Sequence, residues 1–179
     1  SAESVNLLFK VSRESSLIRK AMINCFGQMA STLSYVTHNN IYFTINCINE
    51  LLSLDQSITF IIFFDLIKKC FERLKKTMKN RNAKNITKLY GYRVTMTLKL
   101  IISFLGFCEK SKEDFRLITE ISYPLVELIQ SLLELYPHSK YYPLFLKHLR
   151  MLIDIQKHLH TRIPLSSAIF KLMNNRSFL

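Results

Sequence analysis

Apolar residues recur along most of this chain at spacings of three and four positions, the period of one face of an α-helix. A first helix is predicted over residues 17–36, after the potential capping residues Ser15 and Ser16. Its apolar positions are Leu17, Ala21, Cys25, Met29, Leu33 and Val36. A second helix is predicted over residues 41–52, with apolar positions at Ile41, Ile45, Ile48 and Leu52.

The clearest helical pattern follows the sequence LSLDQS, which supplies a break and the next cap. Its apolar positions alternate spacings of four and three, and we expect them to form the buried face: Phe60, Phe64, Ile67, Phe71, Leu74 and Met78. Lysines and arginines occupy the other faces. A polar loop, NRNAKN, is expected next, followed by a fourth helix with apolar positions at Tyr90, Val94, Leu98, Ile101, Leu105 and Cys108. The sequence EKSKED is expected to close it.

Prolines organise the last third of the chain. After a short helical piece predicted over residues 115–121, Pro124, Pro143 and Pro164 each open an apolar segment, and proline is well suited to the first turn of a helix. The segments are residues 125–135, 144–159 and 165–173. One helix in roughly every 20 residues gives hairpins of the size of a HEAT or armadillo unit. The predicted fold is therefore all-α, an α-solenoid of HEAT/armadillo-like helical hairpins.

We expect one helical-repeat domain over residues 1–179, with residues 1–14 forming at most a partial or poorly ordered helix. The chain has only three glycines, which favours helices over glycine-rich hairpins, and it lacks an initiator methionine, as expected of a fragment. The most apolar run, ITFIIFFDLI, is far shorter than the roughly 20 residues that span a bilayer. Four cysteines without a C-x-x-C pair indicate a reducing compartment.

Charge is distributed unevenly. The formal net charge is +12, yet residues 21–67 contain no lysine or arginine, whereas residues 68–88 contain nine basic residues and the single acid Glu72. Such a local field attracts polyanions or an acidic protein surface. The candidate RNA-binding residues are Lys68, Arg73, Lys75, Lys76, Lys79, Arg81, Lys84 and Lys88.

Two other interpretations of this basic segment remain open. The first is a solvated face without a ligand, which is what a run of charged residues usually forms. The second is a membrane-surface or calmodulin-type amphipathic helix, in which Phe60, Phe64 and Phe71 lie opposite the lysines. Tyrosines at positions 90, 92, 141 and 142 either stack on bases or, as is more usual, fill gaps between helices.

Signs of catalysis are weak. His158 and His160 are separated by two positions, which directs side chains on a helix to different faces, so we expect surface histidines rather than a zinc site. Phosphate-binding glycine loops, nucleophile elbows and HExxH motifs do not occur in the sequence. The sequence predicts a protein that is not an enzyme and has no cofactor.

The three proline-opened helices share a recognisable pattern. It consists of a Tyr-Pro-Leu start, a break, an aromatic-aromatic-Pro-Leu restart followed by Arg and Leu, and an Ile-Pro-Leu opening. The matching residues, expected as inter-helix hinge and packing positions, are Tyr123, Pro124, Leu125, Tyr141, Tyr142, Pro143, Leu144, Arg150, Leu152, Ile163, Pro164 and Leu165. This pattern resembles the nucleolar complex protein 2 family, and a fainter likeness extends it over residues 15–175. Tyr92, Phe145 and Lys147–His148 depart from the family pattern and mark a divergent member.

The resemblance implies a non-enzymatic scaffold or assembly factor for the precursor of the large (60S) ribosomal subunit, located in the nucleolus. It implies a partner of the nucleolar complex protein 1 or 3 type and contact with the pre-60S particle. The basic segment is expected to bind pre-ribosomal RNA, and neither a membrane nor a small-molecule substrate is expected. The alternative is a helical-repeat adaptor for transport or membrane-surface binding that makes no RNA contact.

Overall fold

The computed structural model describes residues 20, 24, 41–111, 120–135, 141–160 and 162–173, and within these ranges the regular secondary structure is entirely helical. The helices are α3 (Ile41–Ser53), α4 (Gln56–Lys79), α5 (Ala83–Leu89), α6 (Tyr92–Ser111), α8 (Ser122–Glu134), α9 (Tyr142–Leu159) and α10 (Ser166–Met173). The all-α prediction is therefore confirmed. The helix predicted over residues 17–36 lies outside the described residues except for Lys20 and Asn24, as does most of the piece predicted over 115–121.

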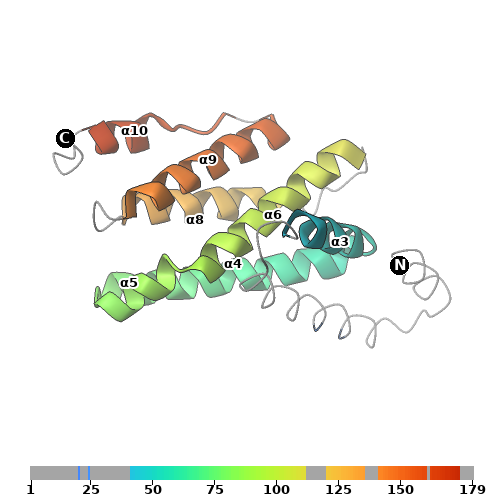
Figure 1. The fold of residues 1–179 in the computed structure, drawn as a ribbon, viewed down its shortest axis with the longest axis horizontal. Helices are drawn as coiled ribbons and strands as arrows, with labels where there is room; N and C mark the ends of the chain where they lie inside the picture. Colours follow the sequence, from blue (N-terminus) through green and yellow to red (C-terminus); the bar gives the residue numbers. More distant parts are fainter. Residues whose placement is uncertain are drawn as a thin grey trace.

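Helix α6 lies at the centre of the described bundle (Figure 1). It packs against α3, α4 and α9, while α8 packs against α4, α9 and α10. The core contains the fully buried side chains of Phe63 from α4, Phe104 from α6 and Leu125 from α8. The Phe63 and Phe104 rings meet edge to face with their centroids 5.4 Å apart, a favourable arrangement for aromatic pairs.

The predicted break between the first two described helices is confirmed. The carboxylate of Asp55 accepts a hydrogen bond from the backbone N–H of Ile58 at 2.9 Å, which caps the start of α4. The buried hydroxyl of Thr59 donates a hydrogen bond to the carbonyl oxygen of Leu52 in α3. These two side chains fix the turn from α3 to α4.

The predicted buried face of α4 is confirmed at Ile67 and Leu74, is half-buried at Phe60 and Phe71, and is wrong at Phe64 and Met78. The buried residues are Ile58, Thr59, Ile62, Phe63, Ile67, Cys70, Leu74 and Thr77, whereas Phe64 is 52% exposed and Met78 is 60% exposed. The predicted and observed stripes share Ile67 and Leu74, and both have spacings of three and four, so the helical period alone does not separate them. Contact with α6 selects the stripe that contains Phe63, and the Phe60 and Phe64 rings instead stack at the surface, 6.1 Å apart.

Cysteine packs in this core as a small apolar residue, as predicted from the sequence. Cys70 and Cys108 are buried as free thiols, and Cys47 is half-buried. Burial raises the pKa of the Cys70 thiol to about 11, although the charge of Arg73 opposes this shift. The thiol of Cys70 therefore stays protonated at neutral pH.

The segment predicted as a polar loop is helical from Ala83 onward. Asn82 accepts a hydrogen bond from the backbone N–H of Asn85 at 2.8 Å and caps the short helix α5. Tyr90 ends α5, and α6 begins at Tyr92, so the predicted fourth helix corresponds to α6 and α5 is an additional helix before it. A Cβ atom at Gly91 would lie 2.9 Å from the carbonyl oxygen of Thr87, so this junction requires a glycine.

The proline-opened helices α8, α9 and α10 match the predicted segments within three residues at each end. Pro143 lies in the first turn of α9. A backbone N–H at that position has no acceptor within the helix, so a proline there costs no hydrogen bond. Residues 83–110, which combine α5 and α6, are long and apolar enough by composition to cross a membrane. Within their most apolar window 61% is buried against the rest of the protein, as in the core helix of a packed bundle.

Candidate nucleic-acid interface

The basic segment forms the C-terminal half of α4, the turn after it and α5. Neutral polar side chains hold the turn: Thr77 donates to the carbonyl oxygen of Arg73 at 2.9 Å, and the side-chain amide of Asn85 donates to the carbonyl oxygen of Asn80 at 2.9 Å. Because these contacts use neutral groups, the lysines and arginines are left free to face solvent. All eight candidate RNA-binding side chains are exposed.

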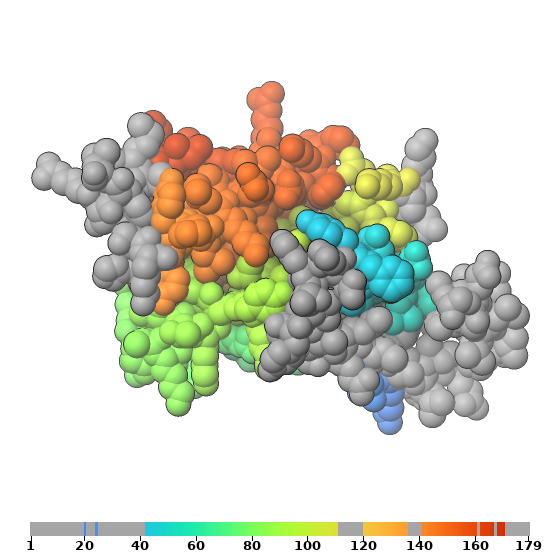
Figure 2. Space-filling view, in the orientation of Figure 1, coloured from blue at the N-terminus to red at the C-terminus, as the bar shows by residue number. Residues whose placement is uncertain are grey.

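Two adjoining surface hollows gather most of these cations. We call the first the basic groove, and its lining residues are Glu72, Lys75, Lys76, Lys79, Asn80, Asn82, Lys84, Asn85 and Lys88. It lies between the end of α4 and α5, whose surface forms the green lobe at the lower left of Figure 2. Five lysines therefore face one groove in which Glu72 is the one acid.

The second hollow lies where α4, α5 and α6 meet, and we call it the junction hollow. Its lining residues are Arg73, Lys76, Thr77, Asn85, Lys88, Gly91, Tyr92 and Arg93. It shares Lys76, Asn85 and Lys88 with the basic groove, so the two hollows adjoin each other. Arg93 is not among the residues predicted from the sequence, because it lies five residues beyond the charge run. Its position beside Tyr92, a possible stacking residue, is the signal that could have identified it.

The structure brings six of the eight candidates into these hollows. They are Arg73, Lys75, Lys76, Lys79, Lys84 and Lys88, whereas Lys68 and Arg81 line neither hollow. Within the described part of the chain, none of the eight forms an ion pair, since both ion pairs found there involve Glu109. A concentration of unpaired positive charge raises the free energy of the isolated fold by self-repulsion, and an anionic ligand relieves that repulsion.

The four tyrosines considered as stacking residues lie in different environments. Tyr90 is buried, its hydroxyl donates to the carbonyl oxygen of Leu132 at 2.8 Å, and its ring centroid lies 5.4 Å from that of Tyr141. Tyr142 is half-buried. Tyr92, in contrast, is 44% exposed and lines the junction hollow. It is the tyrosine of the four best placed to contact a ligand.

Most residues of the proline pattern lie at or just before helix starts, whereas Arg150 and Leu152 lie in the middle of α9, and the set differs in burial. Leu125 and Leu152 are in the core, and five residues are half-buried beside it: Pro124, Tyr142, Leu144, Ile163 and Leu165. Tyr141 is half-buried against Tyr90. Pro143, Arg150 and Pro164 are exposed, and Tyr123 is 76% exposed. Tyr123 therefore contributes little to the core.

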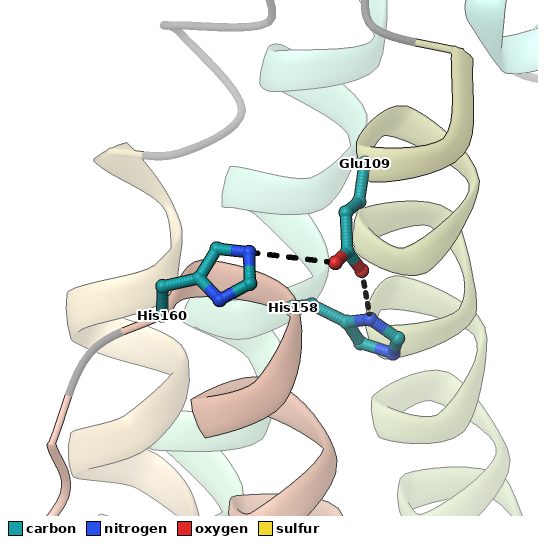
Figure 3. Close-up of polar contacts among 3 residues, drawn as sticks. All are labelled: Glu109, His158 and His160. Atoms are coloured by element: carbon teal, nitrogen blue, oxygen red, sulfur yellow. Dashed lines mark hydrogen bonds and ion pairs between the residues drawn. The ribbon is translucent and has the colours of Figure 1, made fainter.

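The prediction that His158 and His160 point to different faces is wrong. Figure 3 shows both rings directed at the carboxylate of Glu109 on α6, with Nδ1 of His158 2.7 Å from one oxygen and Nε2 of His160 3.6 Å from the other. Helix α9 ends at Leu159, and His160 has the left-handed φ of 49°, which turns its side chain back. The hydrogen bond from His158 lowers the pKa of the Glu109 carboxyl. No group of three metal-binding side chains occurs in the described ranges.

His148 is a buried residue whose role the sequence did not suggest. It is 1% exposed, and neither ring nitrogen has a hydrogen-bond partner among the described residues. Burial, with a smaller contribution from the charge of Lys147, lowers its pKa from 6.5 to about 4. His148 is therefore a neutral core residue at physiological pH.

Comparisons with known proteins place the chain in a family. The model of the Noc2p family matches residues 15–179. Nucleolar complex protein 2 of Drosophila melanogaster is 22% identical over 161 residues, which cover 90% of this chain and 20% of that protein. A NOC2 family protein of Schizosaccharomyces pombe is 29% identical over 125 residues, covering 69% and 23% respectively. Nucleolar complex-associated protein 2 of Arabidopsis thaliana is 25% identical over 152 residues, covering 85% and 19%.

This chain thus spans about a fifth of the length of the curated relatives it matches. The names of the fly and plant relatives indicate a nucleolar location, in agreement with the location expected from the sequence. The family model covers nearly the whole chain, including the proline-opened helices and the basic segment. The chain therefore belongs to the Noc2p family.

Proposed function

We propose that this chain is a non-enzymatic scaffold in the assembly of the large (60S) ribosomal subunit and binds pre-ribosomal RNA through the basic groove. The observation that supports this proposal best is the gathering of seven cations around two adjoining hollows, none of them in an ion pair with another described residue. Phosphate contacts of this kind hold RNA without reading its sequence. A groove of this composition suits a polyanion better than it suits an apolar peptide.

A protein partner is the second part of the proposal. The partner is a sister protein of the nucleolar complex protein 1 or 3 type, within the pre-60S particle. Large aromatic side chains that the bundle leaves exposed, Tyr42 and Phe43 on α3 and Phe64 on α4, supply apolar surface for such a contact. The packed pairs α3–α4 and α8–α9 serve in this proposal as hairpins of a HEAT/armadillo-like repeat.

The RNA part is tested by removing charge from the groove. A variant with Lys75, Lys76, Lys79 and Lys84 replaced by Gln gives up as many as four lysine–phosphate interactions. The slope of log affinity against log salt should fall by roughly 0.7–0.9 for each phosphate that is no longer neutralised. Its melting temperature should change little, because surface substitutions usually alter stability by only about 0.5 kcal/mol.

The matched control replaces Lys110, Arg150, Lys157 and Arg162 by Gln, which removes the same charge from exposed positions that line neither hollow. This control should retain the salt slope of the original protein. Equal effects in both variants would mean that net charge, and not the groove, determines binding. Unchanged RNA affinity in the groove variant, together with binding to anionic vesicles or acidic peptides, would favour the adaptor function instead.

A further inference from the structure

The junction hollow differs from the basic groove in its chemistry. Its lining contains four cations, Arg73, Lys76, Lys88 and Arg93, together with the aromatic ring of Tyr92, and no acidic residue. The basic groove, in contrast, contains Glu72 and no aromatic residue. Cations alone suit phosphates on any nucleic acid, whereas an aromatic ring beside them also suits the flat face of a base.

Three different helices deliver these groups to one place. Arg73 and Lys76 come from α4, Lys88 from α5, and Tyr92 with Arg93 from the first turn of α6. Gly91, whose backbone lies close to the carbonyl oxygen of Thr87, joins α5 to α6. Tyr92 and Lys88, on either side of this junction, both line the hollow. The neighbouring Tyr90 is anchored in the core through its hydroxyl, so the junction has a fixed support beneath it.

From this arrangement we propose that the junction hollow binds an unpaired nucleotide of RNA. The base of this nucleotide stacks on Tyr92, and the phosphates on either side of it contact Arg73, Lys88 and Arg93. In a duplex the bases are stacked on one another and are not available to an aromatic side chain, whereas in single strands, loops and bulges they are. The proposal rests on the proposed RNA-binding function and assigns a substrate class to it, namely RNA with an unpaired residue.

The test compares two RNA probes on the intact chain. One probe is oligouridylate, whose bases stack weakly on one another, and the other is an RNA duplex with an equal number of phosphates. Replacing Tyr92 by Ala should weaken oligouridylate binding by roughly 5- to 150-fold, which is the measured range for loss of one base–aromatic stack. Duplex binding should stay within about 2-fold, because a duplex contacts the site through phosphates.

Two variants keep the test specific to stacking. Tyr92→Phe retains the aromatic ring and should bind oligouridylate as the original protein does. Tyr123→Ala removes an exposed tyrosine of α8 that lines neither hollow, and it should also leave binding unchanged. The salt slope offers a separate readout: Tyr92→Ala should leave it unchanged, while Arg93→Gln should reduce it by about 0.7 on single strands.

The outcomes separate this proposal from the function on which it rests. If the four-Gln groove variant loses affinity and salt slope while Tyr92→Ala binds both probes normally, RNA binding stands and the nucleotide site is wrong. If Tyr92→Ala weakens both probes equally, with its helical content intact, the tyrosine supports the surface without stacking, and the proposal is also wrong. If neither variant changes RNA binding, both proposals fail.

Discussion

The two ends of α6 carry charge in opposite ways. At its first turn, Arg93 joins three other cations around a hollow whose lining has no acid. At its last turns, Glu109 is held by His158 and His160 from the end of α9. Charge at the first end stays available to a ligand, whereas charge at the second end is paired inside the protein and joins two helices. The first end therefore presents the exposed cations on which the proposed RNA contact rests, whereas the second end is organised for packing.

The largest expected loss of stability comes from the contact between α4 and the middle of α6, which lies between these two ends. Replacing Phe63 by Ala removes a fully buried ring that packs against Phe104, and it should destabilise the protein by roughly 3–5 kcal/mol. The matched control is Phe64→Ala on the next position of α4. Because Phe64 is exposed, its replacement should cost at most about 1.5 kcal/mol, mainly from its stacking with Phe60. Urea unfolding curves of the two variants measure the difference, and equal losses of stability would contradict the observed face of α4.

The next effect is a pH dependence that arises at His148. Its pKa is about 4 in the folded protein and 6.5 when unfolded, so the unfolded chain binds the proton more tightly. The stability that this neutral histidine provides is fully present above pH 6.5 and is lost as the pH falls toward 4. The loss amounts to roughly 3 kcal/mol.

Replacing His148 by Leu should remove this part of the acid sensitivity. The measurement is the free energy of unfolding at a series of pH values for both proteins. A His148→Leu variant with the same decline between pH 6.5 and pH 4 would show that other groups cause it. The Glu109 carboxyl, whose pKa is lowered below 4.5, adds its own loss of stability only at more acidic pH.

The smallest effect is expected at Gly106, beside the histidine end of α6. A Cβ atom there would lie 2.7 Å from the ring of His158, so Gly106→Ala should push that ring away from Glu109. The weakening of this exposed ion pair and the better helix propensity of alanine, about 1 kcal/mol, oppose each other. We therefore expect a net stability change of less than about 1 kcal/mol, with the pKa of Glu109 rising toward its ordinary value.

Removing the histidine isolates the steric effect. In a His158→Ala background, Gly106→Ala meets no ring and should stabilise the protein by up to about 1 kcal/mol. Titration of the Glu109 carboxyl by NMR and thermal melts of the four proteins complete the cycle. The same effect of Gly106→Ala in both backgrounds would mean that the ring of His158 does not restrict this position.

Helix positions were largely predictable from sequence because local chemistry specifies them. Asp55 caps α4 and Pro143 opens α9, and each acts on residues next to it in the chain. The buried face of α4 was not predictable, because the stripes that contain Phe63 and Phe64 both satisfy the helical period. Packing against Phe104 of α6, more than 40 positions along the chain, decides between them. The NRNAKN segment appeared as a loop because the capping role of Asn82 does not stand out among three asparagines.

The candidate site was predictable in part, for a similar reason. A run of cations between residues 68 and 88 cannot be buried without partners, so its exposure follows from the sequence. The junction hollow depends on α6 returning to α4, which places Arg93 near Arg73, and no local pattern indicates this. The contact of Glu109 with His158 likewise joins residues 49 positions apart, and His160 is two positions further along the chain.

The bond between Tyr90 and Leu132 has a consequence for the order in which the chain is made. Every residue that lines the two hollows lies between Glu72 and Arg93, but the carbonyl oxygen that receives the Tyr90 hydroxyl comes 42 residues after that tyrosine. Helix α4 also packs against α8, so part of its core face stays uncovered until α8 has been synthesised. The support beneath the two hollows is therefore complete only after residue 132 has been translated. The RNA binding proposed for them is accordingly expected of the finished domain and not of the nascent basic segment.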